Sequence, residues 1–495
     1  MNDRLMKRPL RLACFVLLGA AALAGRGSAE VDQELLPLIK SLKPAVVNID
    51  VNTAIALGGD VPGNWSGTGF IVDAEHGWVA TNRHIVSRSP AQYKINFYDG
   101  QTTAKVRLLY YDAWADLAIL KFDTSTVRGA LTSVSFGDPS AIKEQEKVFL
   151  IGNNEGQNYT ILYGEIMNTT KNPAISDDPA GDSHRHTSSF QVVYGTRGGS
   201  SGSPVFDRRG KVIGLQCSAN ETTGDALKIS YVADALRCLR GGQGSCRGDI
   251  GVVLDLIKIS DAENYLHLPK ATVAEMTASG LSEGDVKDVV YVRKTIPNGP
   301  ADDKLESGDV IFSVAGKVIG NSLYAFDREI DRNVSGSVPI KIIRAGREST
   351  VSVAVQNADI NKISRFVSFG GGVFHEATPE LRRRFAVYGA GVIMNQADPG
   401  SSLDIGSRMD KFPLWRQVLV QTINGSPISD LDQFIAEAAK LKDEDQIYVT
   451  ARDFVAFDTS PKIITMNLNL KYQPLKQYRF SPQTLAWEEL PQANP

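Results

Sequence analysis

The sequence predicts a multidomain protein in which an all-β region is followed by two related mixed α/β modules. The first observation is length, because 495 residues exceed what one ordinary hydrophobic core supports. The second is a series of brief strand-like segments that runs from residue 44 to residue 235. The third is an internal duplication, which begins after a Gly/Ser-rich stretch at residues 241–245.

The N-terminal segment has the layout of a secretory signal peptide. Basic residues between Arg4 and Arg11 precede an apolar run from Leu12 to Ala24, and small residues follow as far as Ala29. This order is typical of a signal peptide that is cleaved after Ala29, and the run is too short for a comfortable membrane span. We therefore expect residues 1–29 to be removed and the protein to be periplasmic or secreted. The alternative is an uncleaved N-terminal anchor.

The β signal between residues 30 and 247 comes from short segments separated by Gly, Asn and Asp. Because helical periodicity is scarce there, the pattern predicts a barrel or a sandwich. The exception is YVADALRCL (231–239), which has apolar residues at helical spacing and is stopped by Gly241 and Gly242. The strand-like segments are AVVNIDVNT, GTGFIVD, WVATNRHIV, YKINFYDG, AKVRLLYYD, LAILKF, KVFLIGN and KVIGLQC.

Two later stretches share one order of elements, namely strand, glycine turn, strand and helix. They are RKTIPNGPADDKLESGDVIFSVAGKVI (293–319) and VLVQTINGSPISDLDQFIAEAAK (418–440). We predict two modules of ordinary domain size at residues 248–357 and 358–475. Residues 476–495 carry no strong signal and are assigned to a C-terminal tail.

The net charge and the cysteines restrict the partners and binding sites that we expect. The net charge is −3 and no basic stripe is present, which argues against nucleic acid as a partner. Apart from the signal segment, the cysteines are Cys217, Cys238 and Cys246. Export would allow a disulfide between Cys238 and Cys246, with its oxidation state left open. No pattern indicates a metal site, and we predict no metal and no cofactor.

The stretch GTRGGSSGSPVF (195–206) poses the main chemical question, because it packs three serines into a glycine-rich turn before a strand. A phosphate cradle would need a lysine after the glycines and a following helix, and neither is present. A plain linker fits poorly, because PVFDRRGKVIGLQC predicts a hairpin directly afterwards. The remaining interpretation is a turn that presents one serine as a nucleophile, which requires a base and an acid elsewhere.

Both groups are available upstream. His84 follows an apolar strand in WVATNRHIVS, and Asp116 leads into a buried apolar run in AWADLAILKF. A buried aspartate is costly unless it is paired, and an imidazole N–H suits it. A histidine can take the serine proton while the aspartate fixes its tautomer. The plainer alternatives are a structural histidine, a turn-capping aspartate and an ordinary Gly/Ser loop. The order His, Asp, Ser within one all-β segment favours the catalytic interpretation, with the N–H groups of Gly199 and Ser201 as an oxyanion hole.

These motifs resemble those of the HtrA/Deg family, which are DegP-like, trypsin-like serine proteases with C-terminal PDZ domains. GTGFIV, TNRHIV, DLAILKF and GGSSGSPVF match its strand, His, Asp and Ser motifs, and RGDIGVVL and NGPADDKLESGDVI resemble its PDZ domain. TNRH and GGSSGSPV are closer to the nuclear HtrA-like proteases of fungi. The resemblance implies a chymotrypsin-like double β-barrel followed by two PDZ-like domains, the second of them divergent.

The resemblance also implies roles for individual residues. His84 would be the general base, Asp116 its orienting acid and Ser201 the nucleophile, with Ser200 and Ser203 as rivals. The substrate pocket would be uncharged and suited to a modest apolar residue, and the first PDZ-like domain would hold peptide C-termini in a carboxylate loop. The pocket residues are Gly195, Leu215, Gln216 and Cys217, and the loop residues are Asp249, Ile250, Gly251 and Val252.

The implied function is an exported serine endopeptidase of protein quality control that cleaves unfolded or damaged proteins. The family resemblance implies a trimer or a multiple of it. The second module carries the glycine-rich stretch FGGGVF (369–374), and there a docking role is at least as plausible as peptide capture. The main alternative from another class is a chaperone or scaffold that holds unfolded chains with little proteolysis.

Overall fold

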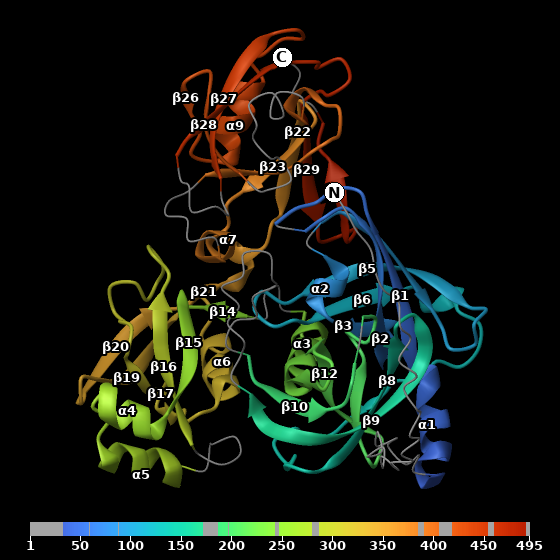
Figure 1. The fold of residues 1–495 in the computed structure, drawn as a ribbon, viewed down its shortest axis with the longest axis vertical. Helices are drawn as coiled ribbons and strands as arrows, with labels where there is room; N and C mark the ends of the chain where they lie inside the picture. Colours follow the sequence, from blue (N-terminus) through green and yellow to red (C-terminus); the bar gives the residue numbers. More distant parts are fainter. Residues whose placement is uncertain are drawn as a thin grey trace, which may run out of the picture.

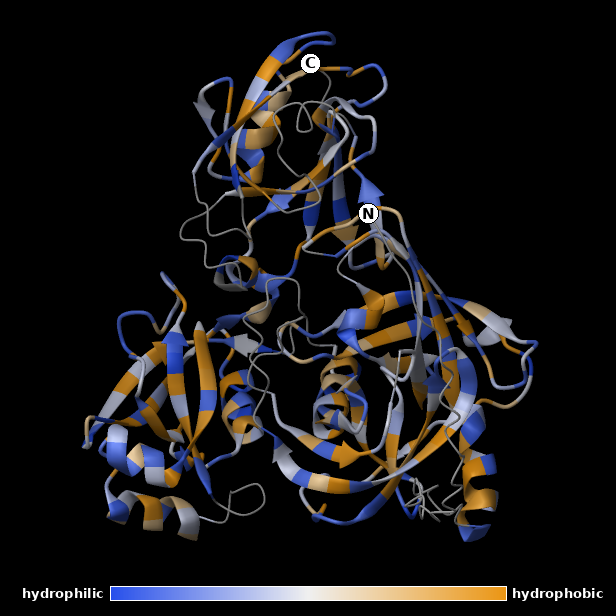
Figure 2. Cartoon of the chain, viewed as in Figure 1, coloured by the Kyte–Doolittle hydropathy of each residue, from blue (hydrophilic) through white to orange (hydrophobic). Residues whose placement is uncertain are grey.

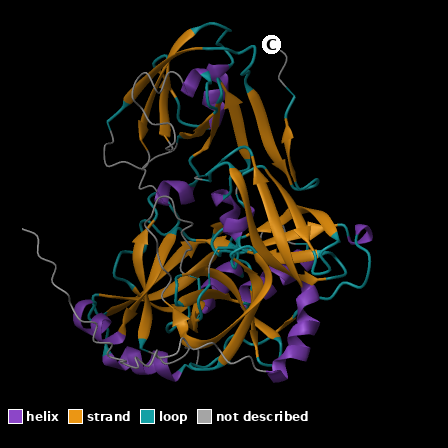
Figure 3. Cartoon of the chain, turned by 45° about the vertical axis from the view of Figure 1, so that its right-hand side comes forward, coloured by secondary structure: helices purple, strands orange, loops and turns teal. Residues whose placement is uncertain are grey.

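The computed structural model describes residues 33–58, 60–87, 89–171, 187–196, 198–242, 247–279, 287–384, 391–404, 418–453 and 460–491. The predicted signal peptide (1–29) and Cys246 lie outside these residues. Figure 1 shows three bodies, with the barrels at the lower right, the first module beside them and the second module above both, and Figure 3 shows the same arrangement turned by 45°. Within the described ranges, no helix has the length and apolarity needed to cross a membrane.

The first β-barrel is closed and antiparallel, with strand order β1-β2-β3-β6-β5-β4. Its strands show the alternation that a half-buried sheet requires, since Val47, Ile49 and Val51 of one strand all enter the barrel core. The strands are β1 (Val46–Thr53), β2 (Gly63–Asp73), β3 (Trp78–Thr81), β4 (Ala91–Asn96), β5 (Thr103–Tyr111) and β6 (Ala118–Phe122).

The second barrel closes because β11 pairs with both β8 and β12, and a short β7 adds in parallel to β12. Together the two barrels confirm the predicted double-barrel fold. The helix expected at 231–239 is α3 (Ser230–Arg240), and α1 (Leu36–Leu42) precedes the first barrel. The strands are β7 (Ser135–Phe136), β8 (Lys147–Asn154), β9 (Gln157–Lys171), β10 (Ser189–Val193), β11 (Pro204–Asp207), β12 (Lys211–Ala219) and β13 (Thr223–Lys228).

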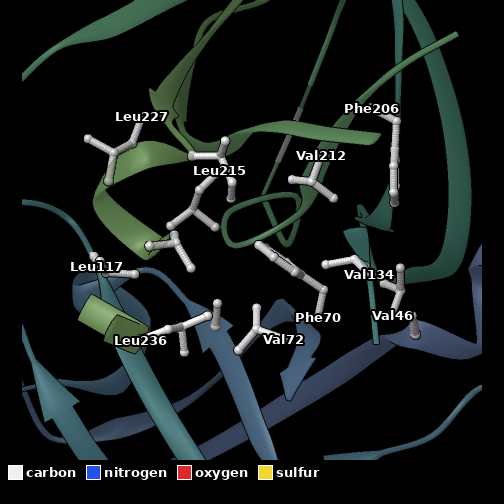
Figure 4. Close-up of a cluster of buried hydrophobic side chains, with 14 of the residues drawn as sticks. Val46, Phe70, Val72, Leu117, Val134, Phe206, Val212, Leu215, Leu227 and Leu236 are labelled. Carbon is white, nitrogen blue, oxygen red and sulfur yellow. The ribbon is translucent and has the colours of Figure 1, made fainter. Parts of the chain in front are cut away.

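The two barrels share a hydrophobic cluster, which Figure 4 shows in close-up. Phe70 and Val72 enter it from β2, while Phe206 and Leu215 enter it from the second barrel. Figure 2 colours the residues by hydropathy and shows hydrophobic and hydrophilic residues alternating along many strands. Because the barrels are packed against each other, loops from both can meet at their junction.

The first module is an antiparallel sheet, β15-β16-β17-β19-β20, with β18 attached to β17. Strand β15 is an end strand of this sheet, and β14 pairs separately with β21. Its elements are β14 (Gly248–Asp249), β15 (Val252–Lys258), α4 (Ile259–Tyr265), α5 (Lys270–Ala278), β16 (Asp288–Thr295), β17 (Val310–Val314), β18 (Lys317–Val318), α6 (Leu323–Asp331), β19 (Ser337–Arg344), β20 (Arg347–Ala354) and β21 (Gln356–Asn357).

The second module repeats this order as β23-β24-β25-β27-β28, with β26 attached to β25. Its sheet continues past β23 into β22, β29 and β30, so residues assigned above to a C-terminal tail form two of its strands. Its elements are β22 (Arg365–Phe369), β23 (Gly372–Glu376), α7 (Pro379–Arg384), β24 (Val392–Ala397), β25 (Val418–Ile423), β26 (Ser426–Pro427), α9 (Leu431–Ala438), β27 (Gln446–Asp453), β28 (Lys462–Asn467), β29 (Lys476–Ser481) and β30 (Ala486–Glu489).

Candidate active site

His84 lies on the short helix α2 (Arg83–Val86), which follows β3 of the first barrel. Its ring Nδ1 is 2.7 Å from Asp116 Oδ2, and its backbone N–H donates to Asp116 Oδ1 at 3.0 Å. The histidine side chain is 31% exposed, whereas that of Asp116 is 1% exposed. A carboxylate accepts hydrogen bonds and does not donate them, so this contact puts the ring proton on Nδ1 and leaves Nε2 as an acceptor.

Asp116 is positioned by the loop between β5 and β6. Asn82 donates from Nδ2 to the Asp116 carbonyl oxygen at 2.9 Å, and the same Nδ2 lies 3.2 Å from Cys217 Sγ. Arg83 is buried, and its guanidinium donates to the Ala113 carbonyl at 3.0 Å, which ties α2 to this loop. The sequence analysis missed both residues, although they stand directly before the histidine in TNRH.

The three candidate serines differ sharply in exposure. Ser200 and Ser203 are 2% and 0% exposed, whereas Ser201 is partly exposed. Ser200 Oγ donates to Asn154 Oδ1 at 2.9 Å, and Ser203 Oγ is buried. Ser201 Oγ donates to the Cys217 carbonyl oxygen at 3.3 Å. Of the three hydroxyls, that of Ser201 is therefore the one a substrate can reach.

The glycine-rich turn is fixed by hydrogen bonds to its carbonyl oxygens. Those of Gly199 and Ser201 accept from the Thr68 side chain and backbone N–H, both at 2.9 Å, and that of Gly198 accepts from the Glu155 N–H at 2.9 Å. Thr68 belongs to the GTGF motif, and the sequence analysis did not foresee this anchoring role. With the carbonyls held in this way, the N–H groups of Gly199 and Ser201 donate to no residue in the described ranges.

Two glycines in the turn adopt a backbone that other residues rarely reach. Gly199 has φ +96° and Gly202 has φ +85°. A Cβ at Gly199 would lie 2.5 Å from the Asn153 carbonyl oxygen, and one at Gly202 would lie 1.9 Å from the Thr68 carbonyl oxygen. Glycine is therefore required at both positions for sterics as well as for conformation.

The predicted pocket residues do not all face a cleft. The Leu215 side chain is fully buried in the cluster between the barrels, as Figure 4 shows, so its side chain cannot line a pocket. Gln216 is buried as well, where it accepts a hydrogen bond from the Tyr194 hydroxyl. Gly195 is exposed. Leu215 and Gln216 are consecutive residues of β12 and point to opposite faces of the strand, and both faces are buried here.

Cys217 lies at the centre of the site and is partly buried. Its carbonyl oxygen contacts Ser201, and its sulfur contacts Asn82 next to Asp116. Burial, and then the nearby charge of Asp116, raises the pKa of the Cys217 thiol well above its usual value. This side chain is therefore a neutral thiol that packs between the serine turn and the aspartate loop.

The loop predicted to hold a peptide carboxylate is buried in the structure. Asp249, Ile250 and Val252 are each 3% exposed or less. The Gly251 N–H donates to Asp249 Oδ1 at 2.8 Å, so a carboxylate of the chain itself occupies this donor. The barrel residue Trp114 donates from Nε1 to the Gly248 carbonyl at 3.2 Å, which closes the loop against the Asp116 segment.

The remaining predictions concern cysteines and metals. Cys238 is disulfide-bonded and Cys217 is free, while Cys246 lies outside the described residues. Across the described ranges, no group of three His, Cys, Asp or Glu side chains is arranged to hold a metal ion.

Comparisons with known proteins agree with the fold. A trypsin-like peptidase domain matches residues 67–215, and a PDZ-like domain matches residues 362–444. The chain is 28% identical over 442 residues to the pro-apoptotic serine protease nma111 of Aspergillus oryzae, covering 88% of this chain and 41% of that protein. It is 28% identical over 416 residues to NMA111 of Lodderomyces elongisporus, covering 84% and 41%. The chain thus spans about two fifths of these relatives' length, and the predicted likeness to fungal HtrA-like proteases is confirmed.

Solved structures give a more distant match. The HtrA-type protease AlgW with decapeptide aligns with TM-score 0.45 and 20% identity, covering 64% of this chain and 97% of that one. The serine endoprotease from Yersinia pestis aligns with TM-score 0.42 and 20% identity, covering 64% and 96%.

Proposed function

We propose that the chain is a serine endopeptidase of the HtrA family of trypsin-like serine proteases with PDZ-like domains. The observation that carries the proposal is the pairing of His84 with Asp116, in which Nδ1 and Oδ2 are 2.7 Å apart. It leaves Nε2 able to accept a proton, and Ser201 is the partly exposed serine of the three candidates. Ser201 would be the nucleophile, His84 the general base and Asp116 the group that fixes the tautomer.

In the proposed reaction, Ser201 Oγ attacks the carbonyl carbon of a peptide bond while its proton passes to His84 Nε2. The carbonyl oxygen becomes an oxyanion and accepts hydrogen bonds from the N–H groups of Gly199 and Ser201. His84 then gives the proton to the leaving amine, and an acyl-enzyme remains. Water, deprotonated by the same histidine, hydrolyses the ester and restores the serine.

The hydrogen bond of Ser201 is consistent with a resting enzyme. In the structure its hydroxyl donates to the Cys217 carbonyl at 3.3 Å. In the proposed reaction this hydroxyl donates to His84 Nε2 instead, and catalytic hydrogen bonds commonly tighten only when substrate is bound. The anchored carbonyls of the turn support a preformed oxyanion hole.

We further propose that the protease acts outside the cytoplasm on unfolded or damaged proteins. Export rests on the signal-like residues 1–29. Peptide binding is assigned to β15, since it is an end strand whose edge can accept another strand. A peptide carboxylate would have to displace Asp249 from the Gly251 N–H to use the adjoining loop. We also propose that the protein assembles into a trimer or a multiple of a trimer.

One observation favours a second function, a chaperone or scaffold with little proteolysis. The Ser201 hydroxyl donates to Cys217 and not to the histidine, which is also what a weakly active site would show. Such a protein would suppress the aggregation of an unfolded chain without shortening it.

The test compares three single substitutions, Ser201→Ala, Ser200→Ala and Ser203→Ala, on reduced casein as an unfolded substrate. Ser201→Ala should lower kcat by about 10⁶-fold, as loss of a catalytic serine does elsewhere, and should abolish labelling by a serine-directed phosphonate. The other two variants keep a labelled serine. Equal cleavage by the parent and Ser201→Ala would refute the proposal, and aggregation suppression without cleavage by the parent would support the second function.

A further inference from the structure

The peptide-binding edge of the second module is already occupied by a strand of the same chain. Strand β22 pairs antiparallel with β23 through Val367 with Phe374, Ser368 with Val373, and Phe369 with Gly372. The two strands are joined by Gly370 and Gly371, both with positive φ. That two-residue turn is typical of a tight hairpin. The glycine-rich stretch FGGGVF is therefore a hairpin turn and not an open loop.

Comparison of the two modules shows what β22 replaces. Strand β15 of the first module corresponds to β23 of the second, since each starts the repeated sheet order. Helix α6 corresponds to α9, because each follows the small attached strand. PDZ-like modules take an extended peptide by adding it to this edge, beside this helix. Strand β15 is the end strand of its sheet, whereas the corresponding edge of β23 is paired with β22.

Contacts with α9 place β22 in the groove itself. Phe434 of α9 lies 6.1 Å from Phe369 of β22 and 4.4 Å from Phe374 of β23, measured between ring centroids. All three rings are buried in one cluster. The outer edge of β22 pairs with β29, so this strand cannot leave without opening the sheet on both sides.

The same module holds a loop of the first barrel. Leu57, between β1 and β2, is fully buried against Phe366 of β22 and Val373 of β23. Phe366 also stacks on Tyr478 at 4.6 Å and contacts Trp487 at 5.0 Å, so β29 and β30 complete the hydrophobic patch. Figure 1 shows β22, β23 and β29 at the side of the second module that faces the first barrel.

Two hydrogen bonds fix this loop to the second module. The Gly58 N–H donates to His375 Nε2 at 3.1 Å, and the Ala56 N–H donates to Gln396 Oε1 at 2.9 Å. His375 is fully buried, and its Nδ1 lies 3.0 Å from the Glu376 carbonyl oxygen. A carbonyl oxygen only accepts, so Nδ1 carries the proton and Nε2 accepts the hydrogen bond from the Gly58 N–H.

From this loop the contacts run directly to the helix that carries His84. Asp60 Oδ2 accepts from Ser87 Oγ at 2.6 Å and from Ser89 Oγ at 2.8 Å. Ser89 Oγ in turn accepts from the Leu57 N–H at 2.8 Å. Ser87 is the residue that ends α2, and its φ of +64° is a conformation that needs support from its surroundings.

We propose that the second module is a closed PDZ-like module, with β22 as its own ligand, and that its partner is the first barrel of the same chain. Through His375 it braces the 56–60 loop and thereby the C-terminal end of the His84 helix. His375 is a positioning residue in this scheme. The kinetic part of the proposal rests on the proposed role of His84, whereas the structural part does not.

The brace is tested with His375→Ala and His375→Gln in the full chain. Alanine removes the acceptor for the Gly58 N–H, whereas a glutamine side-chain oxygen can replace it. We expect His375→Ala to lower kcat on a short chromogenic peptide by about tenfold or more with KM unchanged, because small displacements of a catalytic group are costly. Hydrogen exchange should become faster in residues 54–58 and 83–87, and His375→Gln should restore both properties.

His267→Ala is the matched control, because it removes an exposed imidazole from the first module. It should leave kcat and exchange unchanged. Exchange in β27 reports whether the second module stays folded in each variant. Unchanged exchange in 83–87 for a folded His375→Ala protein would overturn the brace. If the protein is not a protease, the exchange readout still tests the brace, so the two failures are distinguishable.

The closed edge is tested with a peptide of sequence SRFVSF, which copies residues 364–369. The parent should show no protection of β23 from hydrogen exchange when the peptide is added at millimolar concentration. Val367→Pro removes a backbone N–H from β22 and should loosen its pairing, so the same peptide should then protect β23. Protection of β23 in the parent, or in neither protein, would show that β22 is not a resident ligand.

Discussion

Asp116 holds His84 by two atoms at once, which distinguishes it from a simple ion-pair partner. One carboxylate oxygen accepts from the ring Nδ1 and the other accepts from the His84 backbone N–H. The carboxylate is 1% exposed, so water does not compete for either bond. The ring is therefore held in orientation and in tautomer before any substrate arrives.

Replacement of Asp116 by asparagine should separate these two contributions. An amide NH₂ facing Nδ1 would favour the tautomer with the proton on Nε2, which cannot take the serine proton. We expect kcat to fall by about 10⁴-fold, with KM close to that of the parent. Steady-state kinetics on a chromogenic peptide measures both, and a loss smaller than tenfold would mean that Asp116 does not set the tautomer.

At this scale the sequence predicted the pairing of His84 with Asp116 but not the hydrogen bonds of the three serines. The order of the motifs identified His84, Asp116 and Ser201, because each motif has its own local signature. The burial of Ser200 and Ser203 and the inward side chain of Leu215 depend on how strands from two barrels pack, which the local sequence does not encode.

Among the elements, the serine turn differs most from its appearance in the sequence. Its glycine content suggests looseness, yet its carbonyls are anchored to Thr68 and to Glu155. Glycine is used here for a backbone with positive φ and for close approach to Asn153, and the partners then remove the freedom that glycine brings. We therefore expect the oxyanion hole to be preformed, without a collapsed state.

Gly199→Ala tests that expectation against the matched change Gly198→Ala. A Cβ at Gly199 would lie 2.5 Å from the Asn153 carbonyl oxygen at a φ of +96°, whereas one at Gly198 would meet nothing within 4 Å. Gly199→Ala should displace an oxyanion donor and lower kcat by about 10²–10³-fold. Gly198→Ala should stay within a few fold of the parent, and equal losses in both variants would contradict a turn that is preformed at Gly199.

Elements with distant partners were the ones that sequence reasoning missed. Strand β22 pairs with β29, more than a hundred residues later in the chain, so its neighbour cannot be inferred from local alternation. Strand β29 was assigned to a tail for this reason, and β30, which pairs with β29 in a local hairpin, was assigned to the tail with it. By contrast α3 was predicted almost to the residue, because helical periodicity and its glycine stop are local signals.

At the scale of the whole molecule, a buried charge cluster joins the first module to the barrels. Arg247 is 8% exposed, and its guanidinium lies 3.2 Å from Asp327 and 3.4 Å from Asp331, both on α6. On the other side it lies 3.8 Å from Asp112, in the loop that leads to Asp116. Three carboxylates thus face one guanidinium with little water, so all three cannot be ionised without cost.

The three buried carboxylates around one guanidinium affect the protonation of Asp331. Burial, opposed by Arg247 and reinforced by Asp327, raises the pKa of Asp331 to about 7. Between its unfolded value near 4 and about 7, the folded protein holds a proton that the unfolded chain has released. Stability from this group is therefore fully present below pH 4 and is lost as the pH rises towards 7.

The resulting prediction is that the first module becomes less stable as the pH rises, and that Asp331→Asn removes this dependence. Linkage gives a slope of about 1.4 kcal/mol per pH unit for one such proton. Asparagine keeps an acceptor for the Gly248 N–H, which donates to Asp331 Oδ1 at 2.9 Å, and carries no charge. Urea unfolding of the module, followed by hydrogen exchange in α6 at pH 5, 6, 7 and 8, should show a urea midpoint that falls with pH in the parent and changes less with pH in the variant.

The control is Asp303→Asn, which removes an exposed carboxylate of the same module and should behave as the parent. Stability that rises with pH in the parent, or an unchanged slope in Asp331→Asn, would rule out this carboxyl as the cause of the pH-dependent stability of the first module.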